Sequence, residues 1–477
     1  MNRRQFLSAA AAAGMCLRGA TRRPNIVFIL ADDLGYADLG CYGQEQIRTP
    51  NIDRLSGQGM HFTDAYAGCT VCAPSRSVLM TGMHGGHTAV RANDGATPIL
   101  PEDVTLAQML KSAGYATGGF GKWGLGDVGT TGVPSKHGFD EFFGYLNQVH
   151  AHYYYPHILY NNEKEFALPG NDDGQRKQYS HDVIADHAEA FIRRHKDETF
   201  FCYMPFTLPH LELLVPDDSL NEYKGKFPET KPYVDRNKHF ADQPCPRATY
   251  AGMVSRLDRT VGRMMALLKE LGLEQNTVVF FASDNGGAPA LWGDDYFHSN
   301  GPLRGNKQEF YEGGIRVPMM VRWPGQVAAG AVSHHPWSFV DVMPTLADIA
   351  GTSVTGKIDG LSVLPTLLGP KAQGRQQTHE FMYWELPRYD AKGNVRKELP
   401  AAAVRMGDWK VVRPKPDAKL ELYDLKKDPG ETHDVAAENP AIMARIEEYL
   451  KTARTEPRRA DPSIAPIPWW QRQGHAS

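Results

Sequence analysis

The stretch NIVFILADD, residues 25–33, is a nearly continuous apolar run that ends abruptly in two aspartates. Such a run is typical of a strand that is buried on both faces of a parallel sheet. The same pattern, an apolar run followed by a polar residue, recurs at residues 115–124, 199–210 and 277–287. We therefore expect these four segments to form strands of one parallel sheet.

Helical patterns lie between these segments. Residues 106–114 and 250–272 repeat apolar side chains at helical spacing, and each stretch closes on a glycine. Alternation of strands and helices predicts an α/β fold, with a mostly parallel central sheet flanked by helices.

The character of the sequence changes after Gly369, where a polar linker leads into short strand-like stretches and a final helical one. This change predicts a smaller C-terminal α+β domain with an antiparallel sheet. The expected divisions are an export signal, a large α/β domain, the small domain and a tail, at residues 1–23, 24–370, 371–461 and 462–477.

The bulk composition excludes several classes of protein. The chain has 477 residues, 42% of them hydrophobic, and a formal net charge of −3. It can bury a sizeable core, and it has no global positive field that would favour nucleic acid or an anionic membrane surface. Six cysteines in a chain of this length do not make a disulfide scaffold.

The N-terminus resembles an export signal. Arg3 and Arg4 precede a short alanine-rich apolar stretch that ends near Leu17, too short to span a bilayer. The paired arginines resemble a twin-arginine signal, which predicts export to the bacterial periplasm or the medium. The alternative is a frayed helix at the start of a cytosolic protein.

Polar side chains follow the predicted strands, and the carboxyl ends of parallel strands are where ligands bind in open α/β sheets. These residues are Asp32, Asp33, Lys122, His210, Asp284 and Asn285. Carboxylate and amide oxygens suit Ca²⁺ or Mg²⁺ better than zinc. The alternative is structural, with Asp32 and Asp33 capping a helix and Asp284 and Asn285 in a turn.

A second informative stretch is CTVCAPSRSVLMTG, residues 69–82. Cys69 and Cys72 have the spacing of a redox C-x-x-C pair. That interpretation leaves Pro74 and Arg76 unexplained. Pro74 suits the first turn of a helix, which places Cys72 at a helix N-terminus that favours an anion. Arg76, four residues on, can reach the same anion.

Cys72-Ala-Pro-Ser-Arg76 resembles the sulfatase signature C-x-P-x-R, in which the cysteine is converted to Cα-formylglycine. The resemblance extends over nearly the whole chain, through PNIVFILADDLGYADLGCYG, GKWGLG, SDNGG, LRGNKQEFYEGGIRVPMMVRWPG and LELYDLKKDPGE. It implies an alkaline-phosphatase-like fold and hydrolysis of a sulfate ester. It also implies a formylglycine-generating enzyme that modifies Cys72 before export.

The same resemblance implies roles for individual residues. The calcium ligands would be Asp32, Asp33, Asp284 and Asn285 together with residue 72, with Ca²⁺ preferred to Mg²⁺. Arg76 would activate the nucleophile, and Lys122 and Lys307 would bind sulfate oxygens. His210 would assist the leaving oxygen. Taken singly, Lys307 could be a solvated loop lysine and His210 a turn residue.

One position departs from the family pattern. Sulfatases commonly have G-K-W-H-L-G, in which the histidine contacts the formylglycine and serves as a base for sulfate elimination. This chain has Gly124 in that position. The sequence therefore assigns no elimination base.

The substrate we expect is a sulfated carbohydrate, with Arg91 and Asn93 as candidate contacts just after the nucleophile helix. The alternative for residues 84–93 is a purely structural loop. Aromatic side chains at residues 150–160 could pack against a sugar ring, or they could pack at a sheet edge. Two other functions stay open: a phosphodiester or phosphonate monoester hydrolase, and a disabled glycan-binding protein.

Overall fold

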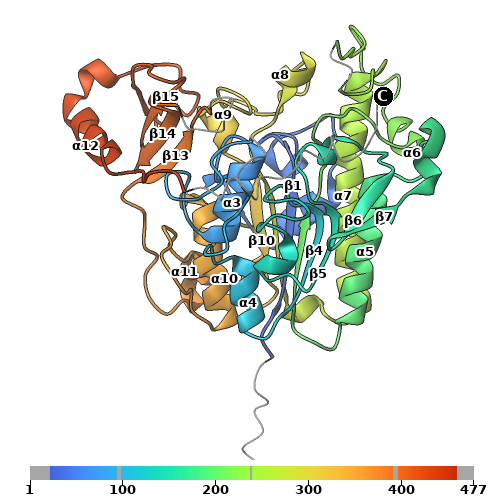
Figure 1. Cartoon of the computed structure of the whole chain (residues 1–477). Helices are drawn as coiled ribbons and strands as arrows, with labels where there is room; N and C mark the ends of the chain where they lie inside the picture. Colours follow the sequence, from blue (N-terminus) through green and yellow to red (C-terminus); the bar gives the residue numbers. More distant parts are fainter. Residues whose placement is uncertain (1–21, 94–97, 237–238, 390–395, 459–477) are drawn as a thin grey trace, which may run out of the picture.

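The computed structural model describes residues 22–93, 98–236, 239–389 and 396–458. A large sheet lies at the centre with helices against both faces, and a smaller sheet lies at one upper corner (Figure 1). The strands of the large sheet run in the order β11-β2-β10-β9-β1-β8-β4-β5-β6-β7.

The five central strands of this sheet are all parallel, and antiparallel pairings appear only toward the edges. The strands are β1 (Asn25–Ala31), β2 (Met60–Phe62), β4 (Ala116–Lys122), β5 (Glu141–Tyr145), β6 (Ile158–Asn161), β7 (Lys164–Ala167), β8 (Phe200–Pro205), β9 (Thr277–Ser283), β10 (Met319–Arg322) and β11 (Ala331–Ser333). The predicted mostly parallel α/β sheet is confirmed, and each of the four predicted segments contains one central strand.

Two helical layers cover the sheet because alternate side chains of each central strand point to opposite faces. Val27 and Ile29 of β1 pack in one core cluster and Phe28 and Leu30 in the other. The first layer contains α2 (Pro50–Gly57), α5 (Ser180–Arg194) and α7 (Pro246–Glu270). The second contains α3 (Cys72–Thr81), α4 (Leu106–Ser112), α10 (Val342–Ala350) and α11 (Leu364–Leu368).

Short elements fill the connections. They are the helices α6 (Asp217–Leu220), α8 (Pro289–Trp292) and α9 (Glu312–Ile315), the 3-10 turn η3 (His150–His152) and the paired strands β3 (Ala65–Tyr66) and β12 (Trp337–Ser338). Among the described residues, every helix is too short or too polar to cross a lipid bilayer. The predicted export signal falls almost wholly on residues 1–21, and the predicted tail on residues 459–477; both stretches lie outside the described part.

The C-terminal part forms the predicted antiparallel sheet. Its strands are β13 (Met382–Leu386), β14 (Ala401–Met406), β15 (Trp409–Arg413) and β16 (Glu421–Asp424), and α12 (Pro440–Leu450) packs on one face. The other face packs against the large domain, where Trp384 meets Tyr66 with ring centroids 5.3 Å apart. The small sheet is therefore fixed beside the segment that leads into α3.

A buried ionic cluster joins the two sheets. Lys410 of β15 places its Nζ 2.8 Å from Glu312 Oε1 and 2.9 Å from Glu431 Oε1, and all three side chains are buried. Burial alone would raise the pKa of the Glu312 carboxyl, but Lys410, Arg316 and Arg405 together lower it to about 2. Burial raises the pKa of Glu431 to about 7, because Lys410 offsets only part of that penalty.

This cluster generates a stability prediction. Lys410→Met removes the central cation and leaves two carboxylates buried, so we expect the free energy of unfolding in urea to fall by about 3–5 kcal/mol. The Glu312 contribution is present above pH 4.5, its ordinary pKa, and is lost as the pH falls toward 2. Lys410→Met should therefore also flatten the dependence of unfolding free energy on pH in that window.

Lys427→Met, which removes an exposed lysine paired with Asp424, is the control and should leave the urea midpoint of unfolding unchanged. A loss below about 1 kcal/mol for Lys410→Met would contradict the assignment.

Candidate active site

Acidic residues gather where two neighbouring parallel strands end. Asp32 and Asp33 follow β1, and Asp284 and Asn285 follow β9, whose Ser283 pairs with Ala31 of β1. The backbone N–H of Asp284 donates to the Ala31 carbonyl at 3.0 Å, and the backbone N–H of Asp33 donates to Asp284 Oδ1 at 3.2 Å. Asp33 has a left-handed backbone with φ of 63°. All four side chains are buried.

Cys72 is the first residue of α3 and faces these acids. Its Sγ lies 3.3 Å from Asp32 Oδ1 and 3.9 Å from Asp33 Oδ1, and Lys307 Nζ lies 3.4 Å from the same sulfur. Burial, with a further contribution from Asp32, raises the pKa of the thiol to about 12. A cysteine in this environment keeps its proton at neutral pH and is a poor nucleophile in its unmodified form.

Three cations compensate the three carboxylates. Arg76 donates to Asp284 Oδ2 through Nε and Nη2, at 3.0 and 2.8 Å, and its Nη1 donates to the Lys122 carbonyl at 2.7 Å. Lys122 Nζ lies 2.7 Å from Asp32 Oδ2, and Lys307 Nζ lies 2.7 Å from both carboxylate oxygens of Asp33. The formal charges of these six side chains therefore cancel.

The pKa values of Asp32 and Asp284 are shifted in opposite directions. Burial alone would raise the pKa of Asp32, but Lys122, His210 and Arg76 hold it well below its usual value. Burial and the neighbouring Asp32 charge raise the pKa of Asp284 to about 7. The negative charge of Asp284 is therefore not fully compensated by the protein's own cations, and a further cation would stabilise it.

The donor set fits a hard divalent cation. Asn285 Nδ2 donates to Asp33 Oδ1 at 2.8 Å, whereas its Oδ1 is buried and accepts no hydrogen bond from any residue the structure describes. Donor atoms of Asp32, Asp33, Cys72 and His210 lie within 4.8 Å of one another. An unsatisfied amide oxygen beside three carboxylates is the donor chemistry that Ca²⁺ and Mg²⁺ prefer.

His210 lies at the edge of the same cluster. Its Nδ1 contacts the Leu211 carbonyl, and its Nε2 lies 3.6 Å from Asp33 Oδ2. The Leu211 contact assigns the ring proton to Nδ1 in the neutral form and leaves Nε2 facing the cluster. Burial and the Lys307 charge lower the pKa of His210 well below its usual value. The His152 ring stacks on it at 4.7 Å.

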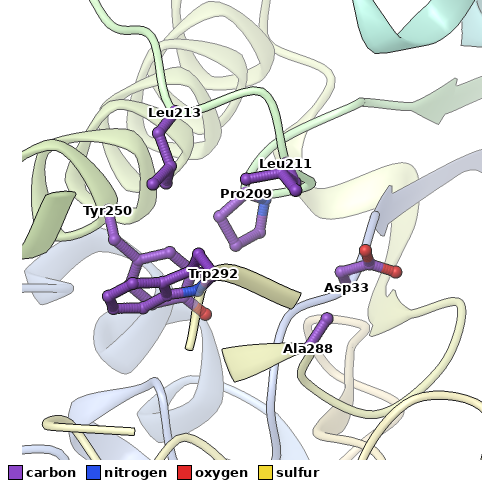
Figure 2. A pocket seen from close by; sticks show the side chains of 7 residues that line it. All are labelled: Asp33, Pro209, Leu211, Leu213, Tyr250, Ala288 and Trp292. Carbon is purple, nitrogen blue, oxygen red and sulfur yellow. The ribbon is translucent and has the colours of Figure 1, made fainter. Parts of the chain in front are cut away.

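A small recess opens beside Asp33 (Figure 2). Its free volume is about 10 Å³, enough for about one water molecule. Apolar and aromatic side chains make most of its wall, among them Pro209, Tyr250 and Trp292. The recess is therefore too small to hold a sugar ring.

The two candidate substrate residues have partners in the protein. Asn93 Oδ1 accepts from the backbone N–H of Ala73 at 2.8 Å, so it fixes the start of α3. Arg91 is buried and donates to Glu385 Oε1 at 3.2 Å and to the Thr455 carbonyl at 3.0 Å. Contact between Arg91 and a substrate would require it to leave Glu385, and both assignments stay predictions.

Two histidines of the same loop, His84 and His87, form hydrogen bonds that hold the loop in place. Asp359 accepts from His87 Nδ1 and from the backbone N–H of His84, both at 2.9 Å. His84 Nδ1 in turn accepts from the Gly86 N–H at 3.1 Å. These bonds tie the loop after α3 to the segment before α11.

Sequence reasoning missed two residues of the segment that follows β5. His152, on His210, lies within a stretch noted only for its aromatic side chains, and Gln148 carried no signal at all. A single glutamine after a strand has no distinguishing pattern. Only the fold brings it beside Gly124, where a Cβ atom would lie 2.4 Å from Gln148 Oε1.

Comparison with known proteins identifies the family. The Sulfatase family model matches residues 24–352, and the model described as N-sulphoglucosamine sulphohydrolase, C-terminal, matches residues 305–457. The chain is 31% identical to arylsulfatase A of Homo sapiens, over 92% of this chain and 89% of that protein. It is 32% identical to N-acetylgalactosamine-6-sulfatase of Canis lupus familiaris, over 78% of this chain and 71% of that protein.

Solved structures agree. Ps i-CgsB, solved in complex with k-i-k-neocarrahexaose, superposes with a TM-score of 0.75 and 30% identity, covering 92% of this chain and 95% of that one. Because a family model spans more than half of the chain and relatives align along most of it, this chain belongs to the sulfatase family of the alkaline-phosphatase-like superfamily and is a sulfatase.

Proposed function

We propose that this sulfatase cleaves a sulfate ester on a sulfated carbohydrate, using formylglycine derived from Cys72 and a calcium ion. The ion's ligands would be Asp32, Asp33, Asp284, Asn285 and residue 72. The observation that carries this proposal is the buried, unsatisfied Oδ1 of Asn285 beside three carboxylates and the first residue of α3.

The charge balance supports an anionic ligand. The six charged side chains of the site cancel formally. A bound divalent cation would supply a net positive charge that favours the sulfate group and polarises its oxygens. Calcium is preferred to magnesium because the site offers protein oxygens in place of the waters that magnesium tends to keep.

The protein's own residues would divide the remaining work. Lys122 and Lys307, one on each aspartate after β1, would bind sulfate oxygens on either side of residue 72. Arg76 would hold Asp284 and the end of β4 in place through its bonds to Asp284 and the Lys122 carbonyl. His210 would face the leaving oxygen with Nε2. Formylglycine would supply a hydrated aldehyde, whose two hydroxyl groups let residue 72 accept the sulfo group and then release it.

The carbohydrate substrate is supported by the relatives. Two relatives are named for a sulfated sugar. One is the N-acetylgalactosamine-6-sulfatase of Canis lupus familiaris. The other is the N-acetylgalactosamine-6-O-sulfatase of Bacteroides thetaiotaomicron, which is 29% identical over 91% of this chain. Twin-arginine export of a folded chain, modified beforehand by a formylglycine-generating enzyme, fits the proposed chemistry. The destination would be the periplasm or the medium.

The nucleophile assignment is tested by Cys72→Ala. We expect turnover to fall to background, because no other group of the site can form the sulfo-ester bond. The matched control is Cys69→Ala, since Cys69 is equally buried but its Sγ contacts the Glu385 carbonyl at 3.5 Å. It should keep activity, whereas a redox pair would need both thiols. Mass spectrometry of the peptide that carries residue 72 should show an aldehyde in place of the thiol. Full activity with unmodified cysteine would refute the assignment.

The reaction is tested by a panel of defined sulfated oligosaccharides together with matched aryl sulfates and aryl phosphates. We expect sulfate release from at least one saccharide and faster turnover of the aryl sulfate than of the aryl phosphate. A preference for phosphate or phosphonate esters would point to the alternative hydrolase. No turnover by chain that carries the aldehyde would favour a glycan-binding protein.

A further inference from the structure

Gln148 is a buried glutamine whose side-chain amide is unused. It is only 7% exposed, and neither Oε1 nor Nε2 has a hydrogen-bond partner among the residues that the structure describes. Buried amides in native proteins are nearly always hydrogen-bonded, so a doubly unsatisfied one needs an explanation. A ligand that bonds to it is one such explanation.

The amide lies in the space that a side chain at position 124 would occupy. A Cβ atom built on Gly124 would be 2.4 Å from Gln148 Oε1. Gly124 also has a φ of 75°, in the left-handed region that favours glycine. The two segments are held side by side, because the Trp123 N–H donates to Tyr145 O at 2.8 Å and the Gly124 N–H to Leu146 O at 3.1 Å.

The segments that meet at this amide also carry residues of the site. Gly124 is two residues beyond Lys122, whose Nζ binds Asp32. Gln148 is four residues before His152, whose ring stacks on His210. The Tyr154 hydroxyl donates to the Thr207 and His210 carbonyls, at 2.9 and 2.5 Å. The segment from Gln148 to Tyr154 therefore runs from the end of β4 to the loop that carries His210.

We propose that Gln148 is a sulfate-binding residue, whose Nε2–H donates a hydrogen bond to an oxygen of the sulfo group as it is transferred. Sulfate oxygens can only accept a hydrogen bond, so Nε2 is the amide atom that would serve them. An amide neither takes up nor releases a proton near neutral pH. Gln148 therefore contributes binding and orientation, and is not a base. This inference rests on the proposed position of the sulfate beside Lys122.

The inference also accounts for Gly124. Where sulfatases commonly have histidine, this chain has a glycine whose missing side chain makes room for Gln148. The segment after β5 would thus supply an amide in the space that a side chain at position 124 would otherwise occupy, in addition to Lys122 at the end of β4. Positions 124 and 148 would then act as one unit, so that a change at either affects the same contact.

The decisive variant is Gln148→Met, which keeps the length of the side chain and removes both polar atoms. We expect kcat/KM for the fastest sulfate ester of the panel to fall about 10- to 100-fold, the range of one hydrogen bond to a charged group. The inhibition constant of inorganic sulfate should rise by a similar factor, while the melting temperature stays the same or increases. An unused buried amide would give the same thermal result with unchanged kinetics.

Gln243→Met is the matched control. Gln243 is also 7% exposed, but its Nε2 donates to the Leu213 carbonyl at 2.9 Å. It should lower the melting temperature and leave the inhibition constant of sulfate unchanged.

Gly124→Ala supplies an independent arm. Its methyl group overlaps Gln148 Oε1, so we expect kcat/KM to fall, and Gly124→Ala combined with Gln148→Ala to be no worse than Gln148→Ala alone. Wild-type kinetics and sulfate inhibition in Gln148→Met would overturn the Gln148 assignment alone. If the wild type that carries the aldehyde hydrolyses no sulfate ester, the proposed function and this inference both fail.

Discussion

The structure depends on the compensation of three carboxylates that are buried together at the ends of β1 and β9. Removing a carboxylate from water is unfavourable unless cations or hydrogen bonds replace the water. Here Arg76, Lys122 and Lys307 come from three different parts of the chain, and each binds one of the acids directly. Helix α3, the end of β4 and the loop after β9 are therefore fixed relative to one another by these ion pairs.

The small C-terminal sheet extends this constraint. Glu385, near the end of β13, binds Arg91 in the loop after α3. That loop continues to Asn93, whose side chain accepts a hydrogen bond from the first turn of α3. Lys410 links the sheet to Glu312 in the segment that follows Lys307. The second sheet thus supports both the start of α3 and the segment that carries Lys307.

Much of this arrangement is predictable from the sequence, for physical reasons. Strands buried on both faces are continuous apolar runs, so β1, β4, β8 and β9 stand out, and the polar residue after each one marks the ligand edge. The limits are equally physical. In α7 a strict four-residue step through Leu257 and Val261 would continue at Met265, but the structure buries Met264, because a helix of 3.6 residues per turn drifts against such a step. The short edge strands β6 and β7 lack a comparable apolar signal.

Partners distant in the chain were beyond sequence reasoning. Nothing in the sequence connects Arg91 with Glu385, which lies 294 residues later. The sequence alone therefore left Arg91 as a candidate for substrate binding. Likewise, Gln148 becomes notable only once β4 and β5 lie side by side and its amide fills the space beside Gly124. Spacing identifies the residues that carry the chemistry, whereas packing decides which neighbours are free to assist them.

The proposed binding of a divalent cation by the buried acid and amide cluster beside residue 72 is open to direct measurement. The metal content of the purified chain is compared between the wild type and Asn285→Leu, which removes the unsatisfied amide oxygen. We expect about one calcium per wild-type chain and loss of the ion in the variant. A variant that folds and keeps its calcium at full occupancy would show that the cluster does not hold the ion in this way.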